Sequence, residues 1–345
     1  MKSLNIGIIG YGWVAGAHIE AINATSRAQV VAVTSSRALD SAELSARHGG
    51  KMDTYTDLAE MLARDDIDAV SICSYPNQHR DHAIAAAAAG KHLIIEKPLA
   101  LSLEHCQDIA AAVKSAGVHA CVCFECRFSS QFTATKAVID QGLLGQVHYG
   151  EIDYYHGIGP WYGQFRWNTT KENGGSSLLS AGCHAMDALL LCMDGDVESV
   201  TSAATGSRNA TFAQYEYPTT SVSIIRFEDG RVGKVASVID CFQPYYFHTH
   251  LVGSEGSLLD DKFHSSKLGT DKAAWSKLSM KMLDSGDVSD HPYQTQFEAF
   301  FAALEDDREM ELTSLDDAMR SFEVIFAADL SAKENRTVTI AELRE

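Results

Sequence analysis

The sequence is short of positive charge. Its 345 residues include 28 Lys and Arg against 46 Asp and Glu, so the formal net charge at pH 7 is −18. Proteins that bind nucleic acids or anionic membranes neutralise phosphates with clustered Lys and Arg. The deficit therefore argues against a nucleic-acid or membrane partner.

Export and membrane signals are also lacking. A strand-like run begins at Leu4 and leaves no room for a signal peptide. The most apolar helical stretch, residues 178–193, carries Ser180, His184 and Asp187, which argues against a membrane span. Eight cysteines without an export signal are expected to be reduced thiols. We therefore expect a cytoplasmic protein.

The length and the element pattern predict two domains. Strand and helix patterns alternate up to residue 122, which is typical of a doubly wound parallel sheet. The expected strands are 4–9, 29–34, 69–73, 93–96 and 118–124, and the expected helices are 17–24, 42–48, 54–63, 82–89 and 102–116. Residues 1–122 are thus predicted to form a dinucleotide-binding domain of the Rossmann type.

Residues 123–345 follow a different pattern, with strands in succession, and predict an α+β domain with an antiparallel or mixed sheet. The expected strands are 146–155, 197–204, 221–227, 232–239 and 247–252, and the helices are 131–141, 178–193, 294–305 and 315–333. Residues 262–290 are polar and are expected to be a loop.

A glycine-rich motif follows the first strand. Gly10, Gly12 and Ala15, with Trp13 and Val14 between them, match the G-x-G-x-x-A form of the dinucleotide fingerprint. Gly10 permits a tight turn, Gly12 lets a pyrophosphate approach the backbone, and Ala15 lets the helix pack on the strand. The alternative is a purely structural glycine turn.

The end of the second strand bears on the choice between NAD and NADP. An NAD site usually has an acidic residue there, whereas this chain has Ser35, Ser36 and Arg37 and no acid before Asp40. Hydroxyls and an arginine suit the 2′-phosphate of NADP, which is slightly favoured. The alternative is a solvated Arg37 and the use of NAD.

Lys97 lies at the end of the buried strand 93–96, in the run Glu96-Lys97-Pro98. Ligands of open α/β sheets bind beyond the carboxyl ends of the strands, so Lys97 is a candidate for chemistry; a surface lysine before a proline is the alternative. The other cofactor contacts expected at this edge are Pro76, Asn77, His79, Glu96 and Lys97.

The second chemical stretch follows Gly174 and Gly175. Ser180, His184 and Asp187 are spaced to share one face of an otherwise apolar helix. Histidine is the usual acid or base near neutral pH. A hydrogen-bonded core histidine is the alternative.

Together, Gly10-x-Gly12-x-x-Ala15, Glu96-Lys97-Pro98 and Gly182-x-His184-x-x-Asp187 resemble the Gfo/Idh/MocA oxidoreductases over nearly the whole chain. The resemblance implies a Rossmann domain and a second domain with a large open sheet that often forms the subunit interface of a homodimer or homotetramer. It implies that Lys97 hydrogen-bonds the reacting substrate oxygen, that His184 exchanges the hydroxyl proton, and that hydride passes to or from a nicotinamide. The Lys-Pro bond of the family is often cis.

One position departs from the family pattern. The family commonly has an aspartate four residues before the histidine, and this chain has Ser180. Serine raises the basicity of a histidine poorly, so the proton relay or the substrate is expected to differ.

Further substrate contacts are expected where aromatic rings and donors suit a carbohydrate. Ordinary loop packing is the alternative for about half of them. The full set is Lys97, Glu125, Arg127, Tyr155, Trp161, Arg166, Trp167, Ser180, His184 and Asp187. No metal is expected, because Cys121, Cys123 and Cys126 lack a fourth ligand nearby.

The sequence thus predicts an NAD(P)-dependent oxidoreductase acting on the CH–OH group of a sugar, polyol or sugar derivative. Two alternatives remain. One is a glycoside hydrolase or lyase that oxidises its substrate only transiently, and the other is a noncatalytic cofactor-binding regulator.

Overall fold

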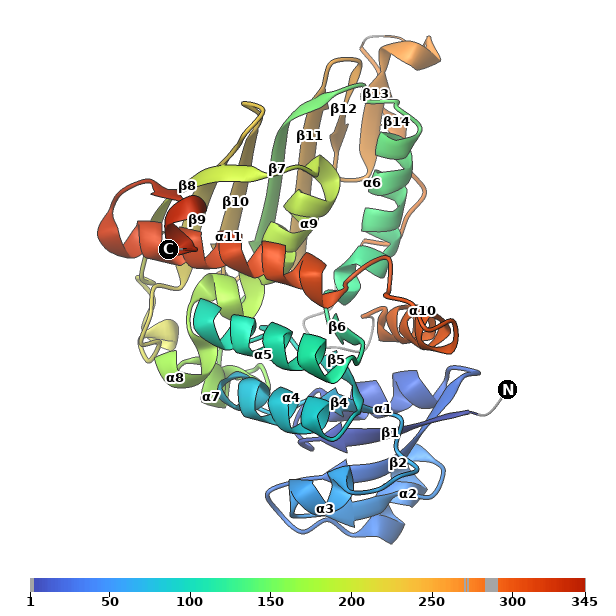
Figure 1. Ribbon diagram of the computed structural model, residues 1–345. Coiled ribbons are helices and arrows are strands. Elements are labelled where there is room, and N and C mark those ends of the chain that lie inside the picture. The colour runs from blue at the N-terminus through green and yellow to red at the C-terminus, as the bar shows by residue number, and fades with distance from the viewer. Residues whose placement is uncertain (1–2, 270, 272, 283–290, 345) are drawn as a thin grey trace. The chain divides into compact units, whose positions relative to one another are not determined.

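The computed structural model describes residues 3–269, 271, 273–282 and 291–344 (Figure 1). The chain forms two compact units, one of residues 1–125 and 292–319 and one of residues 126–291 and 320–345. The second domain predicted over 123–345 is therefore interrupted. Helix α10 (Tyr293–Glu305) belongs to the first unit because its buried face packs on α1 (Ala15–Asn23).

The first unit contains a six-stranded parallel sheet in the order β3-β2-β1-β4-β5-β6, which confirms the predicted doubly wound fold. Its strands are β1 (Leu4–Ile9), β2 (Ala28–Thr34), β3 (Asp53–Tyr55), β4 (Ala69–Ile72), β5 (His92–Ile95) and β6 (Ala120–Val122). Strands β4 and β5 are almost wholly buried, because helices cover both faces of the sheet.

The other helices of this unit are α2 (Ser41–His48), α3 (Leu58–Leu62), α4 (His79–Ala88) and α5 (Leu103–Ala116), with the short turn η1 (Pro76–Gln78). The helix predicted over 54–63 is wrong in its first part. The Asp57 side chain accepts from the N–H of Ala59 and starts α3, while Thr54 pairs with β2 as part of β3.

The second unit contains a nine-stranded sheet in the order β14-β13-β12-β11-β7-β10-β9-β8-β15. Its strands are β7 (Val147–Tyr155), β8 (Val197–Thr205), β9 (Thr220–Phe227), β10 (Val232–Val238), β11 (Tyr246–Gly253), β12 (Gly256–Leu259), β13 (Lys262–Ser265), β14 (Ser276–Lys277) and β15 (Val338–Thr339). Strands β7 and β10 pair in parallel and the other pairs are antiparallel. The predicted α+β class is confirmed.

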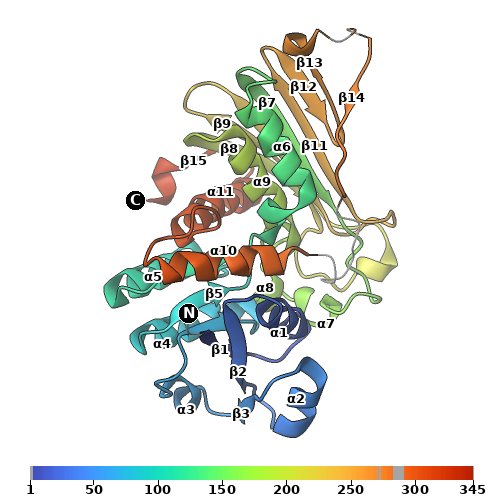
Figure 2. The ribbon, with the colours of Figure 1, turned by 90° about the vertical axis from the view of Figure 1, so that its right-hand side faces the viewer.

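The larger helices of this unit lie on one face of its sheet (Figures 1 and 2). They are α6 (Ser130–Asp140), α9 (Cys183–Met193) and α11 (Leu315–Glu334), the last of which starts in the first unit. Short helices are α7 (Phe165–Asn168), α8 (Lys171–Gly174), η2 (Glu125–Phe128), η4 (Ala210–Phe212), η5 (Ser266–Leu268) and η6 (Ala341–Leu343). Gly150 and Gly233 admit Leu189 of α9, whose methyl groups would lie 3.0 and 2.6 Å from a Cβ at the two positions.

The loop predicted over 262–290 is wrong where β13 and β14 form a hairpin, since Lys262 pairs with Lys277 and Phe263 with Ser276. Residues 270, 272 and 283–290 of that prediction lie outside the described residues. By length and composition alone, Lys171–Met193 could cross a membrane, but 89% of its most apolar window is buried within the fold, as in a core helix.

Candidate active site and cofactor pocket

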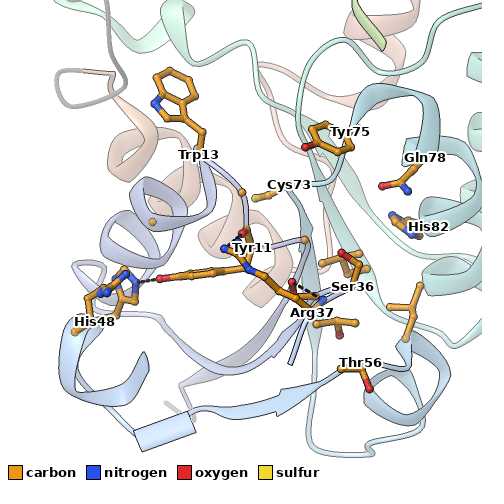
Figure 3. Close-up of a pocket in the computed structure, with 18 residues that line it drawn as sticks. Tyr11, Trp13, Ser36, Arg37, His48, Thr56, Cys73, Tyr75, Gln78 and His82 are labelled. Carbon is orange, nitrogen blue, oxygen red and sulfur yellow. Dashed lines mark hydrogen bonds between the residues drawn. The ribbon is translucent and has the colours of Figure 1, made fainter. Parts of the chain in front are cut away.

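A cavity of about 800 Å³ opens beyond the carboxyl ends of β1, β2 and β4 in the first unit (Figure 3). It is lined by Gly10, Gly12, Trp13, Ser35, Ser36 and Arg37 of the expected cofactor residues. Val14, Pro76, Asn77, His79, Glu96 and Lys97 are not among its lining residues.

The glycine-rich loop fits a dinucleotide phosphate. Gly10 has φ 91°, and a Cβ there would lie 2.9 Å from the backbone of Ser74, so only glycine suits this turn. The position of Gly12 faces open space. Helix α1 starts without a side-chain cap, so its first N–H groups are available to an anion.

Several lining residues were missed by the sequence patterns. Figure 3 shows Tyr11 reaching from the loop to His48, with its hydroxyl 2.8 Å from Nε2. Arg47 also lines the cavity, with an ion pair of 3.0 Å to Glu43 on the same helix. Its helix lies outside the fingerprint, so no local signal indicated it.

Lys97 follows β5 in a segment held by its neighbours. The Lys97–Pro98 peptide bond is cis, as the family resemblance implied. His79 lies under this segment, with Nδ1 2.8 Å from the Pro98 carbonyl oxygen and Nε2 3.1 Å from that of Ser74. Burial lowers the pKa of His79 despite these carbonyls. His79 therefore supports the lysine segment instead of lining the cavity.

The second unit carries His184 at the start of α9, where only 3% of the residue is exposed. The predicted regular helix over 178–193 is wrong in its first turn, because Leu178–Gly182 forms a π-helix. Such π-turns are frequent at functional sites. Gly182 lets this turn approach β10, since a Cβ would lie 2.4 Å from the Ser237 side chain.

Ser180 lies in the π-turn, 5% exposed, with the Tyr217 hydroxyl 3.5 Å from its Oγ. Tyr217 also donates to Asn168, which is fully buried. Gly174 makes room for this group, since a Cβ would meet the Asn168 carbonyl oxygen at 2.2 Å. Where the family has an aspartate, this chain therefore has a serine next to a tyrosine, and no sequence signal indicated Tyr217.

Arg127 and Asp187, both expected to bind substrate, bind each other. Arg127 donates to the two carboxylate oxygens of Asp187 at 2.8 and 2.7 Å, and Ser321 donates to the same carboxylate at 2.8 Å. Both residues are buried, at 7% and 2% exposed. This pair lies one helical turn from His184 and fixes α9 against its neighbours.

The other expected substrate residues are dispersed. Tyr155 lies on the sheet face opposite α9, where its ring stacks on that of Tyr246 with 6.1 Å between the ring centres. Trp161 is 60% exposed but held, with Nε1 donating to the Gly157 carbonyl oxygen at 2.9 Å. Arg166 is exposed, Trp167 is half-buried, and Glu125 of the first unit is fully buried.

The cysteines Cys121, Cys123 and Cys126 are buried, and burial raises the pKa of Cys121 and Cys123. All eight cysteines lie in the described part of the chain, and none is in a disulfide.

The fold and the pocket of the first unit are those of a dinucleotide-binding protein, to which a second, α+β unit is added. Residues 4–124 match the model of the oxidoreductase family with an NAD-binding Rossmann fold, and residues 132–259 match the GFO/IDH/MocA C-terminal domain. The chain belongs to the Gfo/Idh/MocA family.

Curated relatives include dehydrogenases and a reductase. Myo-inositol 2-dehydrogenase of Thermotoga maritima is 26% identical over 258 residues, covering 75% of each chain. The 1,5-anhydro-D-fructose reductase of Ensifer adhaerens is 27% identical over 298 residues, covering 85% of this chain and 84% of the relative. An uncharacterised oxidoreductase of Synechocystis is 29% identical over 188 residues, 54% of this chain and half of the relative.

Solved structures share the fold over the full length. A levoglucosan dehydrogenase in complex with NADH has a TM-score of 0.85 at 21% identity, covering 98% of this chain and 99% of the other. This likeness extends over both units and supports the architecture.

Proposed function

We propose that the protein is an NAD(P)-dependent dehydrogenase or reductase that acts on a CH–OH group of a sugar, polyol or sugar derivative. The observation that carries this proposal is the pocket formed by the glycine-rich loop in the first unit, with Lys97 at the end of the same sheet. Family membership and relatives named as inositol dehydrogenases and an anhydrofructose reductase support the substrate class.

The roles of the side chains follow from their chemistry. A bound nicotinamide accepts or supplies a hydride. The ammonium of Lys97 would donate to the substrate oxygen and stabilise its negative charge as the C–H bond breaks. The imidazole of His184 would take the hydroxyl proton in oxidation and return it in reduction. Loss of the proton from the oxygen allows the hydride to leave the same carbon.

The pocket supports a preference for NADP. Arg37 and Arg47 both line it, and none of its described lining residues is Asp or Glu. Two guanidinium groups suit a 2′-phosphate, whereas the 2′-hydroxyl of NAD is usually bound by a carboxylate. Arg37 already touches the glycine-rich loop, with Nη2 3.4 Å from the Tyr11 carbonyl oxygen.

The decisive experiment is a substrate panel of sugars, polyols and their lactones, assayed with NAD⁺, NADP⁺ and the reduced cofactors. We expect substrate-dependent change in the nicotinamide absorbance and a higher kcat/KM with NADP(H). Product formation without net absorbance change would instead support the transiently oxidising hydrolase or lyase. Tight cofactor binding without turnover would support the noncatalytic regulator.

We also propose a homodimer or homotetramer formed through the open face of the sheet in the second unit. On that face of β9, Val222 and Ile224 are 38% and 45% exposed, whereas their neighbours on the helix side are buried. Apolar side chains on a sheet face suit association with a second copy. Sedimentation of the wild type and of Ile224→Glu tests this, and a wild-type monomer contradicts it.

With eight cysteines outside disulfides, we expect a cytoplasmic enzyme.

A further inference from the structure

His18 on α1 is a buried histidine that plays no part in the function proposed above. Its ring is 0% exposed and lies within hydrogen-bonding distance of two elements of the sheet. Nδ1 is 2.7 Å from Oγ of Ser71 on β4, and Nε2 is 2.9 Å from Oε1 of Glu96 at the end of β5. Both ring nitrogens therefore face an oxygen, as a doubly protonated imidazolium requires.

Glu96 is a buried carboxylate, 6% exposed, with two other donors. The Tyr293 hydroxyl donates to Oε1 at 2.9 Å, and the backbone N–H of Lys97 donates to Oε2 at 3.1 Å. A buried carboxylate is costly unless it is paired with a charge and fully hydrogen-bonded. His18 supplies that charge. The Glu96 carboxylate that His18 stabilises in turn accepts the hydrogen bond from the backbone N–H of Lys97.

The surroundings of His18 favour one orientation and one charge state. The rings of Tyr293 and Phe297 on α10 lie 4.6 and 5.0 Å from the imidazole, centre to centre. Burial opposes protonation, but Cys73 and Glu96 outweigh it and raise the pKa of His18 to about 10. Burial likewise opposes ionisation of Glu96, but the hydrogen bond and charge of His18 outweigh it and lower the pKa of Glu96.

Other titratable groups face the pair. Cys123 and Glu125 follow β6, and Lys97 follows Glu96. The ligand atoms of His18, Glu96 and Cys123 lie within 4.8 Å of one another, which also suits a metal. Structural zinc sites, however, use four ligands, and Nε2 and Oε1 already engage each other at hydrogen-bond distance. The contacts favour an ion pair.

We propose that His18 is a positioning residue for Lys97: its imidazolium holds the Glu96 carboxylate, which holds the backbone N–H of Lys97. The inference rests on the catalytic role proposed for Lys97. Since His18 belongs to the helix that begins at the glycine-rich loop, it also links the cofactor-binding helix to the segment that carries the lysine. Because the Glu96 carboxylate contacts the lysine segment and His18 does not line the cofactor cavity, the pair acts on the chemical step more than on cofactor affinity.

The first test compares His18→Gln, His18→Gln/Glu96→Gln and the wild type, with His105→Gln on an exposed turn of α5 as the matched control. We expect His18→Gln to lower kcat at least tenfold while the Kd for NADPH changes less than threefold. Without the imidazolium, Glu96 takes up a proton nearer neutral pH, so the kcat profile gains an acidic limb that the double variant lacks. His105→Gln should match the wild type.

Two outcomes of this test would overturn the proposal. One is a wild-type kcat and pH profile in His18→Gln. The other is a fall in kcat that follows the melting temperature alone, with the pH profile unchanged, which would make His18 purely structural.

A second test does not depend on turnover. The imidazole ¹⁵N resonances of His18 can be assigned in the cofactor-free protein, because they are lost in His18→Gln. At pH 8 we expect their chemical shifts to be those of an imidazolium. A neutral ring at that pH would refute the ion pair, and a signal shifted by added zinc but restored by a chelator would identify a metal site instead. If no sugar is turned over while the imidazolium is observed, the proposed function fails and the ion pair stands.

Discussion

In each unit a buried carboxylate lies beside a candidate catalytic residue, but the two carboxylates have different partners. Glu96 precedes Lys97 and is paired with His18, whereas Asp187 lies one helical turn after His184 and is paired with Arg127. The Arg127 pair is bidentate, and a guanidinium stays charged wherever proteins are folded. The His18 pair depends on a titratable ring. The Arg127–Asp187 pair is thus a permanent clamp in the second unit, whereas the charge of the His18–Glu96 pair in the first unit responds to pH.

The largest effects are expected from the two candidate catalytic side chains, Lys97 of the first unit and His184 of the second. We expect Lys97→Ala and His184→Ala each to lower kcat/KM by about 10²–10⁴-fold, the usual effect of losing an acid, base or charge at the reacting oxygen. Steady-state kinetics and fluorescence titration of NADPH should show this loss with cofactor affinity retained.

The exposed residues Lys114 and His105 of α5 provide alanine controls that should keep wild-type rates. If both catalytic groups act in one step, the double variant loses less than the product of the single losses. Normal activity in either single variant would remove that residue from the site.

Loss of Arg127 from its buried pair with Asp187 should lower stability much more than loss of an arginine from an exposed pair. Arg127→Met leaves Asp187 buried without its cation, and we expect a loss of about 3–5 kcal/mol in the unfolding free energy of the second unit. Urea unfolding followed by fluorescence measures the loss, and Arg127→Met/Asp187→Leu should recover much of it. Arg226→Ala is the control, because its pair with Glu198 is exposed and is expected to contribute less than about 1 kcal/mol. Equal effects of Arg127→Met and Arg226→Ala would contradict the clamp.

The titratable pair should make stability depend on pH. The folded-state pKa of His18, about 10, lies above the ordinary value of 6.5, so its contribution is complete below pH 6.5 and is lost as pH rises toward 10. The folded-state pKa of Glu96 is lowered, so its contribution is present above its ordinary value of 4.5 and is lost on acidification.

We therefore expect the unfolding free energy of the wild type to fall relative to His18→Gln between pH 6.5 and 10, by up to about 1.4 kcal/mol per pH unit. Parallel stability curves for the two proteins over this range would show that His18 is neutral in the folded state.

The smallest effect is expected at the open end of the cofactor pocket, where charges are solvated. Arg37→Ala and Arg47→Ala should each weaken NADPH binding by roughly tenfold and leave NADH binding nearly unchanged, since only NADPH carries the 2′-phosphate. Arg80→Ala on α4 is the control, because Arg80 does not line the pocket and pairs with Asp108. Equal loss of NADH and NADPH affinity would show that the arginines do not distinguish the cofactors.

Local sequence signals predicted most elements of the fold. Strand β1 was predicted with its observed bounds, and α10 within one residue. The missed strands are short: β3 overlaps a helical pattern, β13 and β14 lie in a polar stretch, and β15 has only two residues. Strands of two to four residues carry too few side chains to show a period, so their pairing partners decide their structure.

The candidate site was less predictable than the fold. Spacing predicted that Ser180, His184 and Asp187 share one face of a helix, but not that Asp187 is bound by Arg127, 60 residues earlier. Likewise, strand alternation puts the adjacent Tyr154 and Tyr155 on opposite faces of the sheet, but only the packing of α9 against one face of β7 placed Tyr155 on the other face. A side chain's type states what it can bind, and its partner follows from the packing of distant elements.

The sequence by itself determined the parallel sheet, the glycine-rich loop and the places of Lys97 and His184, because turn chemistry and periodicity act within a few residues. Tertiary structure alone decided that α10 joins the first unit, that Arg47 lines the pocket and that His18 pairs with Glu96, 78 residues away. Those contacts form between elements that are distant in the chain and become buried together. Burial strengthens a pairing between charges, but no pattern of neighbouring residues indicates which groups will be buried together.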